Sequence, residues 1–323
     1  MSSAARFSEL KVVRWHERIN AHLSGDNIGP IRVNIDLTNL CNHKCFFCEP
    51  VAFREETIRD KQHTLETEKA IELLYHLQKM GTNTIGFSGG GEPLIHHDFG
   101  LIATCANKLG FKTYLVTNGS FLRRWMHVMP LMTNVRVSLD ASNPEEHAKM
   151  HGGKDFDQII ESLRELSGKT ELGISYILSE HNSSPESLLW IQKFAKEIGA
   201  FIQFKPLTED KPSEVGGWFP RNEESHLTEK RRTDVLYQRE FSQCYAGLST
   251  CVVSANGDVT VCCDRRDLAY GNIYQESFAE IWAKRRDTLS KVSPKLCQRC
   301  LMCDFNKSVQ DNVVDDKAKT WLV

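Results

Sequence analysis

The stretch Cys41-Asn42-His43-Lys44-Cys45-Phe46-Phe47-Cys48 holds three cysteines at C-x3-C-x2-C spacing. A loop this short brings three thiolates to one point, and a [4Fe–4S] cluster normally takes four cysteine thiolates as ligands. Three protein ligands predict a cluster with one open iron, and an open position separates a catalytic metal site from a closed structural one. Zinc is the alternative, but zinc sites favour C-x2-C pairs with further ligands well downstream. We expect His43 to be a solvated loop residue.

The composition is that of an ordinary globular protein. The chain has 323 residues, of which 41% are hydrophobic and 25% charged, and its formal net charge is −2. This length suits one large α/β domain and a small second one, and the charge favours neither nucleic acid nor a membrane as partner. Residues 1–10 contain no apolar signal segment, and no stretch is long and apolar enough to span a bilayer. We therefore expect a cytoplasmic protein, whose eleven cysteines are metal ligands rather than disulfides.

Hydrophobic periodicity predicts alternating strands and helices. A lead-in helix over 8–23, ended by Gly29-Pro30, precedes a strand over 31–38, and the cysteine loop follows that strand directly. Further strands are expected at 84–87, 113–117, 135–139, 172–178 and 201–204, and helices at 70–80, 101–109, 120–129, 156–166 and 188–198. Six such units predict an α/β fold, a partial (β/α)6 TIM-like barrel with a parallel sheet inside and helices outside. Active sites of such barrels lie at the C-terminal ends of the strands.

A glycine-rich loop, Ser88-Gly89-Gly90-Gly91-Glu92-Pro93, follows the second predicted strand. Consecutive glycines let the backbone approach a ligand closely. Together with the cysteine loop one unit earlier, this stretch resembles the signature of the radical S-adenosylmethionine (radical SAM) enzymes. In that family the open iron binds the amino and carboxylate groups of the methionine moiety, and the reduced cluster cleaves SAM to a 5′-deoxyadenosyl radical.

The resemblance also implies a SAM-binding role for residues at several strand ends. Gly89, Gly90, Gly91 and Glu92 would hold the methionine ammonium group, Phe47 would present its backbone to the adenine, Asn118 would line the pocket, and Ser138 would contact the SAM ribose or carboxylate. The residues alone also permit a plain turn at Asn118-Gly119 and a packing role for Ser138.

Four regions follow from these patterns. Residues 1–30 form the lead-in helix, 31–207 the barrel, 208–243 a polar and turn-rich bridge, and 244–323 a second cysteine domain. In the bridge, Trp218 either caps the substrate pocket or anchors the bridge itself.

The second cysteine domain contains seven cysteines between Cys244 and Cys303. Two strands flank Asn256-Gly257, which predicts a hairpin with a type I′ turn, and a helix follows through Trp282. This β-hairpin-plus-helix pattern resembles the SPASM or twitch domain found after the barrel in many radical SAM enzymes. The resemblance implies one auxiliary [4Fe–4S] cluster held by Cys244, Cys262, Cys297 and Cys300, with Cys303 as a substitute. Zinc is the alternative ligand for the CxxC pairs.

Two cysteines of this domain remain without a ligand role. The full SPASM pattern has seven cysteines for two clusters, and the C-x2-C-x2-C run here departs from it, so we expect one cluster. Cys251 and Cys263 are then either small buried hydrophobes or candidate hydrogen-atom donors to a substrate radical. A donor cysteine would make the enzyme an epimerase.

The predicted activity is that of a radical SAM oxidoreductase or epimerase. A flavodoxin- or ferredoxin-type donor would reduce the cluster, and the substrate would be a small molecule of the sugar, aminocyclitol or nucleoside type. The roughly 40 residues before Cys41 leave no room for the winged-helix leader-binding domain of many peptide-modifying members. A ribosomal peptide presented by a separate partner remains an alternative.

Two further alternatives are less favoured. The MoaA-like cyclases end in a glycine-rich arginine tail, which the terminal residues Lys-Ala-Lys-Thr-Trp-Leu-Val do not match. An iron–sulfur electron carrier or a zinc-stabilised interaction module would use the cysteines but does not explain the loop from Gly89 to Pro93.

Overall fold

The computed structural model describes residues 15–48, 63–207, 241–263, 265–292 and 302–315. Within them one nine-stranded sheet has the order β6-β5-β4-β3-β2-β1-β7-β8-β9. The first six strands pair in parallel with their neighbours in the chain, as the predicted partial barrel requires. They are β1 (Arg32–Asp36), β2 (Thr84–Ser88), β3 (Lys112–Thr117), β4 (Asn134–Ser138), β5 (Glu171–Leu178) and β6 (Phe201–Pro206). The predicted fold class is confirmed.

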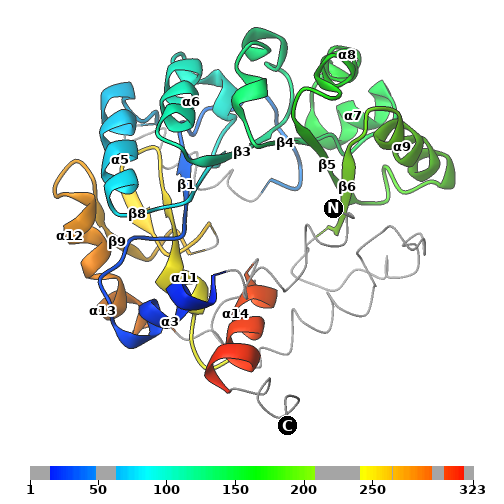
Figure 1. Cartoon of the computed structure of the whole chain (residues 1–323). Helices are drawn as coiled ribbons and strands as arrows, with labels where there is room; N and C mark the ends of the chain where they lie inside the picture. The colour runs from blue at the N-terminus through cyan, green and yellow to red at the C-terminus, as the bar shows by residue number, and fades with distance from the viewer. Residues whose placement is uncertain (1–14, 49–62, 208–240, 264, 293–301, 316–323) are drawn as a thin grey trace.

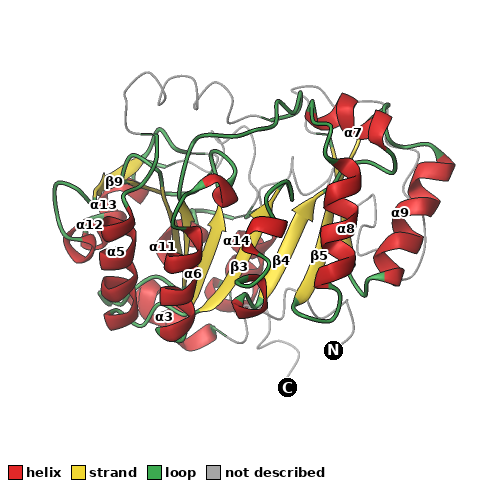
Figure 2. Ribbon diagram, turned by 90° about the horizontal axis from the view of Figure 1, so that it is seen from above, coloured by secondary structure: helices red, strands yellow, loops and turns green. Residues whose placement is uncertain are grey.

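Helices cover the outer face of these strands (Figure 1; Figure 2). They are α5 (Thr67–Lys79), α6 (Phe99–Lys108), α7 (Pro144–His151), α8 (Phe156–Leu166) and α9 (Pro185–Glu197). The lead-in helix α3 (His16–Ser24) lies apart from them, where Ile19 packs in a second cluster with Tyr245 and Leu248. The helix α8 illustrates why they form: its buried residues, among them Ile159, Leu163 and Leu166, recur at helical spacing and face the sheet. No described helix is both long enough and apolar enough to cross a bilayer.

The C-terminal elements continue the barrel sheet. Strand β7 (Thr250–Val253) pairs in parallel with β1, and β8 (Asp258–Thr260) and β9 (Ala269–Asn272) follow in antiparallel order. The accompanying helices are α11 (Tyr245–Ser249), α12 (Phe278–Ala283), α13 (Arg285–Leu289) and α14 (Cys303–Val309), which runs into the π-helical turn η5 (Gln310–Val314). One hydrophobic core runs from Val33 of β1 to Trp282 of α12, so both parts of the chain share their packing.

Several predicted elements differ from the structure. The lead-in helix ends at Ser24, one residue after the predicted end, but Gly25 ends it, with a left-handed φ of 101°, and not Gly29-Pro30. The start predicted for it lies outside the described residues. The helix predicted over 120–129 is wrong. The 3-10 turns η2 (Arg123–Trp125) and η3 (Met129–Leu131) lie there instead, and Pro130, which has no amide hydrogen, falls in η3.

The predicted hairpin is present, but its turn is not type I′. That turn needs positive φ at both central residues. Only Gly257, with φ of 90°, has it, whereas Asn256 does not. Val253 pairs with Val259, and the connection between the two strands is the longer loop 254–257, closed by a hydrogen bond from Ser254 N to Asp258 O of 2.8 Å.

Candidate functional site

The cysteine loop begins just after β1, at the C-terminal edge of the parallel strands. Cys41, Cys45 and Cys48 are all half-buried. Burial raises the pKa of the Cys45 thiol, and the neighbouring Cys48 and Cys41 raise it further. As thiolates, Cys41 and Cys48 would therefore each repel Cys45. A bound cationic cluster relieves this repulsion and replaces the thiol protons, so the donor set fits an iron–sulfur cluster.

The glycine loop after β2 packs directly on the segment that leads into Cys41. A Cβ added to Gly89, Gly90 or Gly91 would collide with atoms of residues 36–40. Backbone hydrogen bonds join the two segments: Gly91 N donates to Thr38 O at 2.9 Å, and Glu92 N donates to Leu40 O at 2.8 Å. The glycines thus permit a close approach between two loops of the chain, in addition to the predicted approach to a ligand.

The carboxylate of Glu92 is buried and accepts three hydrogen bonds within the protein. The donors are the Thr117 hydroxyl at 2.6 Å, the Asn118 backbone N–H at 2.7 Å and the Leu94 backbone N–H at 3.0 Å. Burial raises the pKa of Glu92, while these hydrogen bonds oppose that rise. Glu92 therefore ties the end of β3 to the glycine loop; its contact with a methionine ammonium group stays a prediction.

The other predicted SAM-site residues lie at strand ends around the cysteine loop. Asn118, after β3, donates from Nδ2 to Asn42 Oδ1 at 2.9 Å, so it contacts the loop itself. Ser138 ends β4 and lies in register with Ser175 of β5. The ring of Phe47 meets the ring of His151 edge-on, with centroids 5.6 Å apart.

The prediction of a solvated His43 is wrong. His43 is 3% exposed, and its Nε2 lies 3.1 Å from both carboxylate oxygens of Asp155. His147 Nε2 lies 2.9 Å from the same carboxylate, to which the Ser120 hydroxyl also donates. Burial would raise the pKa of Asp155, but the hydrogen bonds from His147, His43 and Ser120 hold it well below its usual range. The network fastens the cysteine loop to the start of α8.

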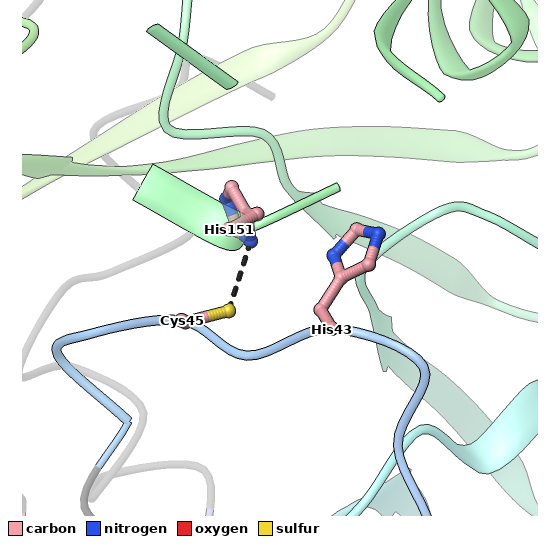
Figure 3. Close-up of side chains that lie close together, drawn as sticks. All are labelled: His43, Cys45 and His151. Carbon is pink, nitrogen blue, oxygen red and sulfur yellow. Dashed lines mark hydrogen bonds between the residues drawn. The ribbon is translucent and has the colours of Figure 1, made fainter. Parts of the chain in front are cut away.

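A second histidine contacts the cysteine loop and has no counterpart in the sequence prediction. His151 Nδ1 lies 3.1 Å from Cys45 Sγ, and Figure 3 shows this contact beside His43. Both His151 and His147 belong to α7, a helix that the periodicity did not reveal. Its signals were Asn143-Pro144, where the Asn143 side chain caps the first turn, and Gly152, whose left-handed φ of 66° ends it.

The predicted auxiliary ligands are partly described. The Cys244 thiol caps α11, where it accepts from Gly247 N at 3.4 Å, and Cys262 follows β8. Burial raises the pKa of Tyr270, and the thiols of Cys251, Cys244 and Cys262 raise it further. Cys297, Cys300 and Trp218 lie outside the described residues, and Cys303 begins α14. Cys251 is buried in β7, whereas Cys263 is exposed.

Two family models match this chain in the same order as its structural parts. The model of the radical SAM superfamily matches residues 35–183, and that of the SPASM iron–sulfur cluster-binding domain matches residues 244–304. The chain belongs to the radical SAM superfamily. Within it, the second match identifies a radical SAM enzyme with a SPASM domain, whose cofactors are [4Fe–4S] clusters and SAM; such an enzyme also needs a reductant.

Curated relatives with similar sequences are GTP 3′,8-cyclases. The enzyme of Aquifex aeolicus strain VF5 is 30% identical over 185 residues, which are 54% of this chain and 56% of that one. A probable GTP 3′,8-cyclase of Methanocaldococcus jannaschii is 27% identical over 227 residues, 68% of this chain and 72% of that one. The match to the Aquifex enzyme thus spans about half of its length.

Solved structures of peptide-bound and SAM-bound proteins share the fold. Streptococcus suis SuiB bound to precursor peptide SuiA has a TM-score of 0.60 and 16% identity, with 85% of this chain and 69% of that one covered. The protein anSMEcpe with bound AdoMet has a TM-score of 0.57 and 17% identity, with 86% and 89% covered. At these identities the likeness establishes the fold.

Proposed function

We propose that this radical SAM enzyme removes a hydrogen atom from an unactivated C–H bond of a small molecule, and that Cys41, Cys45 and Cys48 hold its SAM-binding cluster. One observation carries the proposal: the loop with three half-buried cysteines follows β1 and packs directly against the glycine loop that follows β2. When bound, the reduced cluster and SAM supply the radical that starts the reaction. The residues of the chain hold SAM and the substrate in the relative position that hydrogen transfer requires, and they exclude competing reactions.

Within this site the chain's own residues have distinct tasks. Backbone groups of Gly89, Gly90 and Gly91 line the SAM methionine, and Glu92 fixes the loop that carries them. Asn118 orients the cysteine loop through Asn42. Phe47 presents its backbone to the adenine of SAM, and Ser138 contacts the SAM ribose or carboxylate.

For the net reaction we favour oxidation. One auxiliary cluster on Cys244, Cys262, Cys297 and Cys300, with Cys303 as substitute, would accept the electron that the substrate radical loses together with a proton. Epimerisation is the alternative: a thiol would return a hydrogen atom to the radical, and the external donor would then reduce the sulfur radical. Cys251 is 3% exposed within β7, so the exposed Cys263 is the better-placed donor.

For the substrate we favour a nucleoside-type or sugar-type small molecule. The likeness to GTP 3′,8-cyclases supports the nucleoside class. A ribosomal peptide is the second candidate, and it rests on the fold shared with peptide-bound SuiB.

The test is anaerobic reconstitution with iron and sulfide, followed by dithionite or a flavodoxin-type reductant and SAM. 5′-Deoxyadenosine is measured alone and with GTP, nucleosides, aminocyclitols, sugars or short peptides. We expect slow basal formation that one small-molecule class raises several-fold. Product isolated from D2O distinguishes the outcomes, because thiol-mediated epimerisation adds solvent deuterium and oxidation removes two hydrogens. A cluster-loaded protein that binds SAM but yields no 5′-deoxyadenosine would contradict the proposal.

A further inference from the structure

The C-terminal end of α7 is joined to the cysteine loop at two points. The backbone N–H of Lys44 donates to the carbonyl of His151 at 2.9 Å. The side chain of His151 places Nδ1 3.1 Å from Cys45 Sγ and Nε2 3.1 Å from Asp140 Oδ2 (Figure 3 shows the first contact). His151 is 1% exposed and Asp140 is fully buried, so water does not compete for either contact.

The backbone around Asp140 is held in an unusual conformation. Asp140 has φ of 49° and is the only non-glycine residue of the described part with positive φ. Such a conformation costs about 1–3 kcal/mol and persists where the surroundings impose it. Here Ile177 N–H donates to Asp140 Oδ1, and Asn182 Nδ2 donates to Asp140 O at 2.9 Å. These bonds fix the second carboxylate oxygen toward His151.

Glycines after α7 permit the close contact. Gly152 has a left-handed φ of 66°, and a Cβ on Gly153 would lie 2.7 Å from His43 Nε2. The backbone at residues 152–153 can therefore change direction right after His151 and pass close to His43.

His151 is better explained as a hydrogen-bond partner than as a metal ligand. One atom each of His43, Cys45 and His151 lie within 4.8 Å of one another, which is compatible with a bound metal. However, His43 is held through Nε2 by Asp155, and Cys45 is assigned together with Cys41 and Cys48 to the SAM-binding cluster. A thiolate bound to iron can only accept from Nδ1.

We propose that His151 is a positioning residue that donates a hydrogen bond from Nδ1 to the Cys45 thiolate and thereby raises the reduction potential of the SAM-binding cluster. Both ring nitrogens then carry a hydrogen, and the Asp140 carboxylate, whose Oδ2 lies 3.1 Å from Nε2, provides the negative charge that faces the ring from the opposite side. A sulfur ligand that accepts a hydrogen bond gives less charge to the iron, which favours the reduced state. The step affected is the one-electron reduction by the external donor, and no bond to His151 forms or breaks. The inference rests on Cys45 being a cluster ligand, as proposed above.

The test is a potentiometric titration of the reconstituted full-length protein, followed by electron paramagnetic resonance (EPR). The SAM-binding cluster is identified as the signal that changes when SAM is added. His151→Phe keeps a ring but removes the donor, His151→Gln restores an N–H donor, and His97→Phe makes the same change at an exposed histidine. At a fixed potential, we expect the ratio of reduced to oxidised cluster to fall about tenfold in His151→Phe, or ~59 mV for one electron. His151→Gln should recover part of this change, and His97→Phe should match the unaltered protein.

A second measurement uses the unaltered protein labelled with 15N-histidine. Pulsed EPR should show a weak 15N coupling on the SAM-responsive signal, and its absence would overturn the inference. An unchanged midpoint in His151→Phe with full iron content would also overturn it. Cys45→Ala separates the two proposals, because retention of the SAM-responsive signal in that variant contradicts the cluster assignment itself.

Discussion

Gly91 illustrates how closely two loops of the site approach each other. A Cβ at Gly91 would collide with the carbonyl oxygen of Leu40 and lie 2.6 Å from the carbonyl carbon of Asn39. These are backbone atoms that cannot rotate away, so Gly91→Ala must displace the segment before Cys41. We expect this variant to lose most of the iron bound at the cysteine loop, as measured by iron analysis after reconstitution.

Gly168→Ala is the matched control for Gly91→Ala. Gly168 has φ of 74° and no atom within 4 Å of an added Cβ. Its replacement should cost about 1–2 kcal/mol of folding stability through backbone strain alone and leave the iron content unchanged. Full iron in Gly91→Ala would show that the loop contact is not needed.

Glu92 serves three donors, so its removal should affect stability more than the removal of one donor. Glu92→Ala leaves the backbone N–H groups of Leu94 and Asn118 without this acceptor, and we expect a loss of about 3 kcal/mol in the free energy of unfolding. Thr117→Val removes one of these three hydrogen bonds and the bond that the Thr117 hydroxyl accepts from Gly119 N, and it should cost about 2 kcal/mol. Guanidinium denaturation measures both, and equal losses would contradict the role assigned to Glu92.

At the level of side chains, the sequence predicted the residues that belong to motifs of characteristic spacing. Cys41, Cys45 and Cys48, together with the glycine loop, were predictable because both loops follow neighbouring parallel strands and so meet at one edge of the sheet. The roles of His43 and His151 were not predictable, since each depends on a partner more than 100 positions away. Both histidines are buried because α7 packs against the cysteine loop.

Among the secondary-structure elements, α7 and α8 show what periodicity can detect. In α8 the apolar residues repeat at helical spacing, and its bounds were predicted correctly. In α7 the buried residues are His147, Met150 and His151, so its inward face is mostly polar and carries no hydrophobic repeat. The capping signals at Asn143-Pro144 and Gly152 were the information available for that helix.

Asp155 connects α7, α8 and the cysteine loop, and this connection should depend on pH. Its carboxyl has a pKa below the ordinary value of about 3.9, so it contributes stability above that pH and loses it as the pH falls through the lower folded-state pKa. We expect Asp155→Asn to lower the urea midpoint of the cluster-free protein at pH 7. The difference from the unaltered protein should shrink below about pH 4.

The exposed Asp157 of the same helix provides the control. Asp157→Asn should leave the urea midpoint at pH 7 nearly unchanged. If Asp155→Asn behaved in the same way, the hydrogen bonds from His43 and His147 would not stabilise the fold.

A buried ion pair spans the two halves of the protein. Asp36 ends β1, and Arg266 follows β8; their side chains lie 2.5 Å apart, with 1% and 10% of each exposed. Burial raises the pKa of Asp36, and Arg266 opposes that rise. Arg266→Met leaves the carboxylate without this cation, and we expect a loss of about 3 kcal/mol at neutral pH.

The sign of the pH dependence follows from the raised pKa. Without Arg266, the pKa of Asp36 rises further, so the variant is most stable at low pH and loses stability as the pH rises through that value. Denaturation at several pH values should show this loss, and the double variant Asp36→Asn/Arg266→Met should recover part of it. Equal pH profiles for Arg266→Met and the unaltered protein would contradict this account.

Over the complete chain, alternation predicted the barrel but not how the cysteine domain attaches to it. A repeat of strands and helices specifies parallel neighbours in chain order, as β1 to β6 show. The pairing of β7 with β1 joins segments more than 200 positions apart. The sequence of a strand by itself does not specify which distant strand it pairs with. The third strand, β9, contains Gly271 and Asn272, which are poor strand formers.

The most direct measurement is the yield of 5′-deoxyadenosine from SAM in the reduced, reconstituted protein. We predict that Cys45→Ala abolishes its formation and lowers the bound iron by about four atoms per chain, one [4Fe–4S] cluster. Cys105→Ala, on α6 outside the cysteine loop, should retain both. Formation of 5′-deoxyadenosine by Cys45→Ala at the unaltered rate would contradict the assignment of the cysteine loop as the SAM-cleaving site.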